Sequence, residues 1–191
     1  MKQIPLTLRR WTRAEYDRLV GLGMLHGEPV ELVGGQLVIA EPQGSYHASA
    51  LGAAGDALRA VLPQGWLVRI QMPVALDDES EPEPDLAVVP GAWANYRAGH
   101  PSRPALVVEV AESSLAFDRE AKGSLYARGG VGDYWIVNLV DRALEVYRDP
   151  GSDPAAPYGW RYGAVERLSP AAAASLLALP AVRIAVSDLL P

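Results

Sequence analysis

The chain has 191 residues, 49% of them hydrophobic, a size that suits one compact domain with a substantial core, so we expect a single domain over residues 1–191. The absence of cysteine excludes disulfides, thiolate metal sites and cysteine nucleophiles. The formal net charge of −6 counts against a simple nucleic-acid-binding protein, because phosphate contacts normally require a basic surface.

The N-terminal part of the chain predicts a helix followed by a hairpin. The helix is predicted over residues 12–22, since the sequence Thr-Arg-Ala-Glu at its start is a capping box. Two short apolar runs follow at 30–33 and 36–39, and the two glycines between them favour a tight hairpin. Glu31 lies within the first of these strands.

A second helix and a strand come next. The helix, rich in alanine and leucine, is predicted over 47–62 and begins with His47. The segment 66–76 is predicted to be a strand that is interrupted at Pro73. For His47, at the start of the predicted helix, we favour a capping or packing role over a role in a functional site. Gln71 lies within the predicted strand, where its side chain can face a cleft.

Two carboxylates stand at or within apolar runs. Asp85 comes immediately before the apolar run 86–89, and Glu109 lies inside the apolar run 105–110. A charge on a buried strand is costly unless it is paired or bound to a metal, so Glu109 requires a partner. The loop between the two strands, about residues 90–104, has a length that is typical of functional loops.

A lysine follows the two carboxylates. A helix is predicted over 117–128, and it places Lys122 four residues after Asp118 on the same face. Two carboxylates on neighbouring strands with a following lysine suggest metal-assisted phosphodiester hydrolysis, because Mg²⁺ prefers oxygen ligands. The alternative is structural: Lys122 pairs with Asp118 at the surface, Asp85 is an ordinary turn residue, and Glu109 is a buried partner of an arginine.

The remainder of the chain completes an α+β domain. A hairpin is predicted from strands at 133–138 and 143–147, and a C-terminal extension over 149–191 contains a strand near 160–168. The order of elements indicates a mixed β-sheet flanked by helices, with its core at about 30–148. The aromatic residues expected to pack in the core or at a dimer interface are Tyr126, Tyr134, Trp135 and Tyr147.

Six segments in a fixed order carry a family resemblance. They are Val-Glu-Leu-Val-Gly-Gly-Gln-Leu-Val at 30–38, His47 at a helix start, Glu-Pro-Asp-Leu-Ala-Val-Val at 83–89, Leu-Val-Val-Glu-Val at 106–110, Asp-Arg-Glu-Ala-Lys at 118–122 and Tyr-Ala-Arg-Gly-Gly-Val-Gly-Asp-Tyr-Trp-Ile-Val at 126–137. Together they resemble the Uma2 family of restriction-endonuclease-like proteins, over about residues 8 to 190. The resemblance implies the PD-(D/E)XK nuclease-like fold, with a core of a helix, three strands, a helix and a strand.

The resemblance also implies a set of site residues. Asp85 and Glu109 would be metal ligands, with Glu31 as a supporting acid. Lys122 would be the catalytic lysine of the superfamily, moved to the helix because Ala111 occupies its usual place on the strand. The implied activity is that of an endonuclease acting on DNA with Mg²⁺ as cofactor and Mn²⁺ as an alternative cation.

Three functional hypotheses remain open. The first is a metal-dependent DNA endonuclease. The second is a catalytically inactive nuclease-fold protein that binds nucleic acid or a partner. The third is a metal-independent hydrolase in which Asp85 and Glu109 form an acid/base pair, as on a glycoside.

The sequence also carries expectations about assembly and location. Hairpins that leave sheet edges to be covered favour a homodimer, and so does the need for two active sites in duplex cleavage. No apolar run approaches the roughly 18 residues of a membrane span. The N-terminus has no extended apolar region of the secretory kind, so we expect a cytoplasmic protein with no membrane partner.

Overall fold

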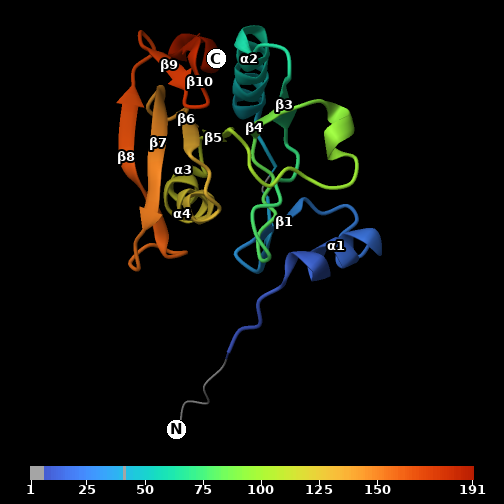
Figure 1. The fold of residues 1–191 in the computed structure, drawn as a ribbon. Helices are drawn as coiled ribbons and strands as arrows, with labels where there is room; N and C mark the ends of the chain where they lie inside the picture. The colour runs from blue at the N-terminus through green and yellow to red at the C-terminus, as the bar shows by residue number, and fades with distance from the viewer. Residues whose placement is uncertain (1–6, 41) are drawn as a thin grey trace.

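A six-stranded mixed sheet runs through the molecule in the order β3-β4-β5-β6-β7-β8 (Figure 1). Its strands are Trp66–Ile70 (β3), Leu86–Pro90 (β4), Leu106–Ala111 (β5), Asp133–Asn138 (β6), Ala143–Ser152 (β7) and Trp160–Leu168 (β8). Within this sheet β5 and β6 pair in parallel, and the other neighbouring strands pair antiparallel. The computed structural model describes residues 7–40 and 42–191, so the predicted domain extends beyond the described residues at 1–6 and 41.

The parallel pair is joined by a continuous helical segment. It consists of an α-helix at Leu115–Phe117 (α3), a π-helical turn at Asp118–Lys122 and an α-helix at Gly123–Arg128 (α4). Parallel neighbours need a crossover of this kind, because a tight turn cannot return the chain to the same end of the sheet. The helix that was predicted at 117–128 begins two residues earlier, at Leu115. It also contains a π turn that the sequence pattern does not reveal.

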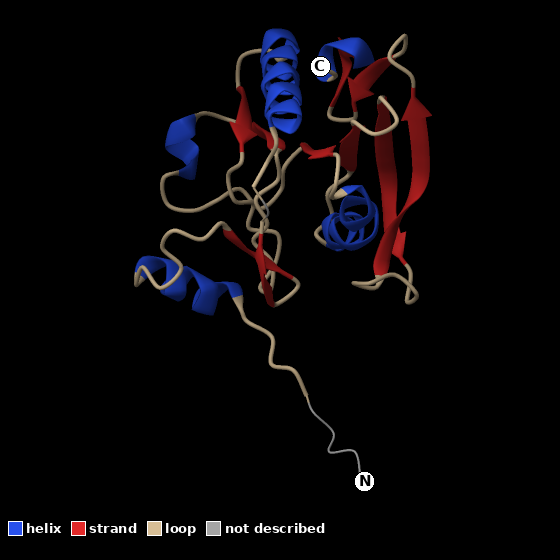
Figure 2. Cartoon of the chain, turned by 180° about the vertical axis from the view of Figure 1, so that it is seen from behind, coloured by secondary structure: helices blue, strands red, loops and turns tan. Residues whose placement is uncertain are grey.

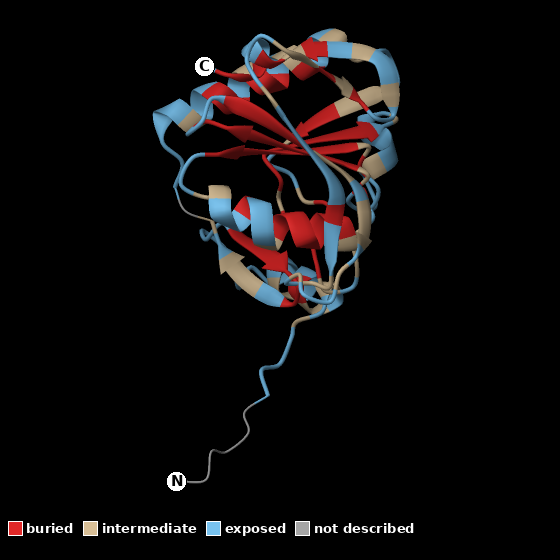
Figure 3. Cartoon of the chain, turned by 90° about the vertical axis from the view of Figure 1, so that its left-hand side faces the viewer, coloured by how far each residue is buried: buried red, intermediate tan, exposed pale blue. Residues whose placement is uncertain are grey.

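The two faces of the sheet are covered by different layers, and the sheet lies buried between them (Figure 3). Leu106, Val108 and Val110 of β5 belong to the larger hydrophobic cluster, which includes residues of α2 (Ser45–Val61). Val107 and Ala111 belong to the cluster on the other face, which includes residues of α4. Because side chains alternate along a strand, Glu109 points to the α4 face.

The larger cluster is completed by C-terminal elements. A hairpin of β9 (Ala173–Leu176) and β10 (Leu179–Ala185) is followed by a 3₁₀ helix at Val186–Leu189. All three contribute buried residues to the cluster beneath α2. The predicted strand near 160–168 is confirmed as β8, whereas the hairpin after it was not predicted.

At the other end of the molecule lie α1 (Arg13–Gly21) and the hairpin of β1 (Val30–Val33) and β2 (Gln36–Ile39), as both Figure 1 and Figure 2 show. The predicted capping box forms at the start of α1, since Thr12 caps the helix and pairs with Glu15. Gly34 and Gly35 form the hairpin turn with φ of 56° and 79°, backbone angles that favour glycine.

Several predicted boundaries are corrected by the structure. The predicted helix at 47–62 begins at Ser45, with Gly44 as its N-cap. The predicted strand at 66–76 ends at Ile70, because Gln71 adopts a φ of 47° that ends the strand. The loop at 90–104 contains a 3₁₀ helix at Trp93–Tyr96.

The predicted packing of the aromatic residues is also tested by the structure. Tyr126, Tyr134 and Trp135 are fully buried in the core, while Tyr147 is partly buried against Tyr134 and Tyr162. Among the helices of the described residues, none has the length and apolar character needed to cross a membrane. The predicted α+β class, with a mixed sheet flanked by helices, is confirmed.

Candidate active site

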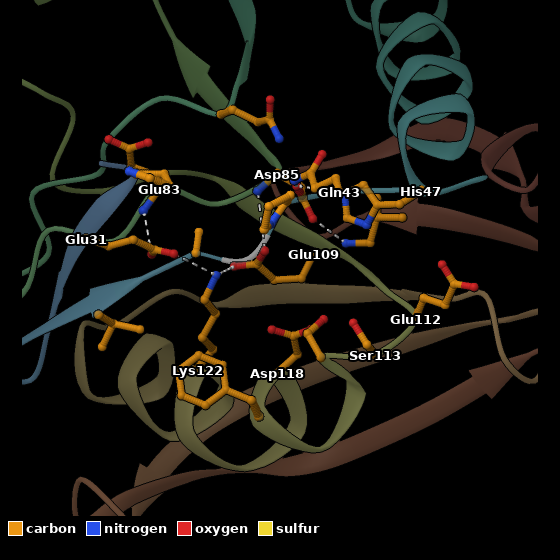
Figure 4. Close-up of a pocket in the computed structure, with 18 of the residues that line it drawn as sticks. Glu31, Gln43, His47, Glu83, Asp85, Glu109, Glu112, Ser113, Asp118 and Lys122 are labelled. Atoms are coloured by element: carbon orange, nitrogen blue, oxygen red, sulfur yellow. Dashed lines mark hydrogen bonds and ion pairs between the residues drawn. The ribbon is translucent and has the colours of Figure 1, made fainter. Parts of the chain in front are cut away.

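Asp85 and Glu109 lie side by side on neighbouring elements (Figure 4). Asp85 immediately precedes β4, and Glu109 lies in the middle of β5, which pairs with β4. The backbone N–H of Asp85 donates to Glu109 Oε2 at 3.3 Å, and the N–H of Val110 donates to Asp85 Oδ2 at 2.9 Å. The exposed fractions of the two acids are only 7% and 3%, so both carboxylates are held in place and largely removed from water.

Glu109 has a lysine rather than an arginine as its partner. Lys122 Nζ lies 3.0 Å from Glu109 Oε1, and the hydroxyl of Tyr126 donates to the same oxygen at 2.6 Å. Glu31 approaches from β1, with its Oε1 3.7 Å from Lys122 Nζ. The structure therefore brings together the four predicted site residues. The alternative in which Lys122 is a surface partner of Asp118 is wrong, because the lysine is 7% exposed and pairs with the two glutamates.

The protonation of this buried pair follows from its surroundings. Burial raises the pKa of Glu109 to about 8, although the nearby charge of Lys122 opposes the shift. Burial alone would lower the pKa of Lys122, but the carboxylates of Glu109, Glu31 and Asp118 together raise it above its ordinary value. Lys122 is therefore held as a cation, which suits charge stabilisation better than proton transfer.

Asp85 is fixed by two further side chains. Gln43 Nε2 and His47 Nε2 each lie 3.3 Å from Asp85 Oδ1. Burial would lower the pKa of His47, but its hydrogen bond to Asp85 and the charge of that carboxylate raise the pKa above its ordinary value. The predicted capping role of His47 is wrong, since Gly44 is the N-cap, and the imidazole instead contacts Asp85.

The π-helical turn contributes Asp118 and Lys122 to the same pocket. The N–H of Gly123 bonds to the carbonyl of Asp118, five residues earlier, and such wide turns are frequent at functional sites. Burial raises the pKa of Asp118 to about 6, an effect that Lys122 opposes. The hydroxyl of Ser114, which lies just before α3, donates to Asp118 Oδ2 at 2.5 Å.

These side chains line one pocket of about 970 Å³. The carboxylates that line it are Glu31, Glu83, Asp85, Glu109, Glu112 and Asp118. Lys122 and His47 are the basic residues among the described residues of its lining, and Gln71 lines it from the end of β3. The pocket therefore has a surplus of negative charge, which favours a bound cation.

The described residues place no group of three His, Asp or Glu side chains in an arrangement ready to hold a metal ion. The pocket does offer the adjacent carboxylates of Asp85 and Glu109, whose hard oxygens are the donors that Mg²⁺ and Mn²⁺ prefer. Two carboxylates are enough for Mg²⁺, which usually keeps several of its waters. The donor set therefore fits a divalent cation that is completed by water and substrate.

Sequence reasoning missed two contacts in this pocket. Gln43 comes from an irregular segment before α2, and no periodicity or motif marks it. Tyr126 was expected only to pack, yet its hydroxyl bonds to Glu109 from α4. The one available signal in the sequence for such a partner was Glu109 itself, a buried glutamate whose carboxylate needs hydrogen-bond donors.

Comparison with known proteins gives a consistent result. The model of the Uma2 family, described as "Putative restriction endonuclease", matches residues 13–187. The fold is similar to that of a solved structure from Anabaena variabilis, described as "a putative nuclease belonging to DUF820". That match has a TM-score of 0.60 and 17% sequence identity, and it covers 84% of this chain and 88% of that chain. No curated protein matches. Since the family model matches most of its length, the chain belongs to the Uma2 family.

Proposed function

We propose that this protein is a nuclease that hydrolyses phosphodiester bonds of DNA with a bound divalent cation, Mg²⁺ or Mn²⁺. The observation that carries the proposal is the convergence of Asp85, Glu109 and Lys122 in one buried acidic pocket. Membership of a family described as "Putative restriction endonuclease" supports the same activity.

Asp85 and Glu109 would hold the cation. When bound, it would neutralise charge on the nonbridging oxygens of the phosphate and lower the pKa of a water. The protein prepares the two carboxylates for this role by fixing their orientation. Gln43, His47 and the N–H of Val110 hold Asp85, and an arrangement that is set before the substrate arrives loses little free energy to reorganisation.

Lys122 would stabilise the negative charge that develops during attack on the phosphate. Glu109 and Glu31 hold its ammonium group within the pocket and keep it charged. Glu31 would act on the reaction through Lys122, because its carboxylate lies 3.7 Å from Nζ. We therefore assign Glu31 a positioning role in support of the lysine.

The pocket also offers a place that favours an anion. The N-terminus of the 17-residue α2 meets the pocket at its N-cap residue Gly44, which has no side chain to cap the helix. The unpaired N–H groups at a helix start favour phosphate. This end of the pocket suits a substrate phosphate in surroundings that are otherwise acidic.

Cleavage assays test the proposed function. Purified protein is incubated with plasmid and with single-stranded DNA, in Mn²⁺ and in EDTA, alongside Asp85→Asn and the control Glu112→Gln. Glu112 is an exposed residue of the same pocket. We expect cleavage in Mn²⁺ alone, lost in Asp85→Asn and kept in Glu112→Gln. Cleavage in EDTA would favour the metal-independent hydrolase, and Mn²⁺ binding without cleavage would favour an inactive nuclease fold.

The homodimer stays a prediction. The outer edges of β3 and β8 end the six-stranded sheet, and edge strands are common sites of pairing between copies. A monomer by light scattering at micromolar concentration would contradict it.

A further inference from the structure

The reactive groups of the pocket are largely buried. Asp85, Glu109 and Lys122 are each at most 7% exposed, within a pocket of about 970 Å³. Pockets of about 300–1,000 Å³ enclose small organic molecules, so this pocket is large enough to take a nucleotide together with its base. A base can enter such a pocket only when it is unpaired, as in a single strand or an extruded nucleotide.

The pocket has an apolar wall that suits a nucleobase. The apolar residues that line it from β2 and the neighbouring chain are Pro29, Val38, Ile39, Ala40 and Pro42. Phe117 lines the pocket from α3 and is 39% exposed. It is the single phenylalanine of the chain, and it lies outside the three hydrophobic clusters that the described residues form. A partly exposed aromatic ring in the lining of the pocket, outside these clusters, is available to stack on a base.

The charge of the pocket also favours an unpaired strand over a duplex. Binding to a duplex depends on several ion pairs between basic side chains and phosphates. The described lining has six carboxylates against Lys122 and His47, and it includes no arginine. Affinity must then come largely from burial and stacking of bases, which are exposed only in unpaired strands.

We propose that the pocket accepts unpaired nucleic acid, a single strand or a frayed end, and that Phe117 stacks on a base next to the scissile phosphate. This proposal rests on the proposed nuclease function. It adds that the substrate is unpaired rather than double-stranded, and that Phe117 determines this preference.

The test compares one fluorescent 15-nucleotide DNA as a single strand and as a blunt duplex, in Mn²⁺. We expect kcat/KM to be at least about tenfold higher for the single strand. Phe117→Ala should raise KM for the single strand by roughly tenfold, within the range of base stacking on an aromatic side chain, and leave kcat within about twofold. Phe117→Trp should restore KM. The control Trp160→Ala removes an exposed aromatic residue on β8, outside this pocket, and should change neither constant.

Equal cleavage of the duplex, or an unchanged KM in Phe117→Ala, would overturn the proposal. If neither DNA is cut, the proposed nuclease function fails, and binding of the same DNAs in Ca²⁺ then decides the substrate class by fluorescence anisotropy. Tighter binding of the single strand that is lost in Phe117→Ala supports the proposal. Equal binding of both DNAs, or no binding, overturns it.

Discussion

Lys122 Nζ lies 3.0 Å from Glu109 Oε1 in the interior of the protein, and each side chain is the main charged partner of the other. Removing one member of a buried pair leaves the other charge without compensation, which destabilises far more than the loss of a surface pair. The pair is therefore a structural element as well as a part of the proposed site.

Lys122→Met should lower the free energy of unfolding by about 3 kcal/mol, because it removes the cation that the buried acidic side chains of Glu109, Glu31 and Asp118 share. Urea unfolding at pH 7 measures this. The control Arg59→Ala removes an exposed pair with Asp56 and should cost less than about 1 kcal/mol. Equal effects of the two changes would contradict the importance of the buried pair.

Lys122→Arg keeps the charge but changes its shape. A planar guanidinium cannot occupy the place of a compact ammonium between Glu109 and Glu31. Cleavage should fall by roughly two to four orders of magnitude, the scale of a lost catalytic group. Mn²⁺ binding by calorimetry should stay near that of the unmodified protein. Undiminished cleavage by Lys122→Arg would remove the lysine from the mechanism.

His47→Ala removes one of the two side chains that hold Asp85 Oδ1. Residues that orient a metal ligand typically contribute about 10- to 100-fold to metal affinity or activity, so the Kd for Mn²⁺ should rise by about that factor. His47→Gln retains an N–H donor and should recover part of the loss. The control Ser49→Ala lies on the exposed side of α2, and an equal effect there would argue against a role for His47.

Glu81, a buried residue outside the proposed site, should make the stability of the protein depend on pH. Burial, reinforced by Asp17, raises its pKa to about 7, although Arg13 opposes the shift. Between pH 4.5 and 7 the unfolded glutamate loses its proton while the folded one keeps it, so the free energy of unfolding falls as pH rises through this window. Glu81→Gln should therefore equal the unmodified protein in stability near pH 4 and exceed it by roughly 2 kcal/mol at pH 8.

Thermal unfolding at the two pH values checks this prediction. The control Glu79→Gln changes a more exposed glutamate of the same segment and should not alter the pH dependence. A difference between Glu81→Gln and the unmodified protein that is the same at both pH values would contradict the expected role of Glu81.

Local patterns predicted much of the fold. The spacing of Thr12 and Glu15 satisfies backbone groups within one turn, so the capping box could be recognised without tertiary information. The burial of Glu109 followed from the apolar residues around it on β5. Its partner was left open between an arginine and a metal, because the choice depends on which helix crosses that face of the sheet.

Other features depend on contacts between distant segments. The hairpin of β9 and β10 is stabilised by packing beneath α2, and its short, alanine-rich strands have a weak pattern of their own. Gln43 reaches Asp85 across 42 positions in the chain, from a segment without regular structure. Such contacts arise only from the tertiary fold, so no local sequence rule identifies them.

The central claim, that Asp85 and Glu109 form one divalent cation site, is tested most directly by calorimetric titration of Mn²⁺ into the unmodified protein and into Asp85→Asn. Asparagine keeps the size of the side chain and removes its charge, so the network with Gln43, His47 and Val110 changes as little as the chemistry allows. We predict saturable Mn²⁺ binding by the unmodified protein that is lost in Asp85→Asn. Equal binding by the two proteins would contradict the site.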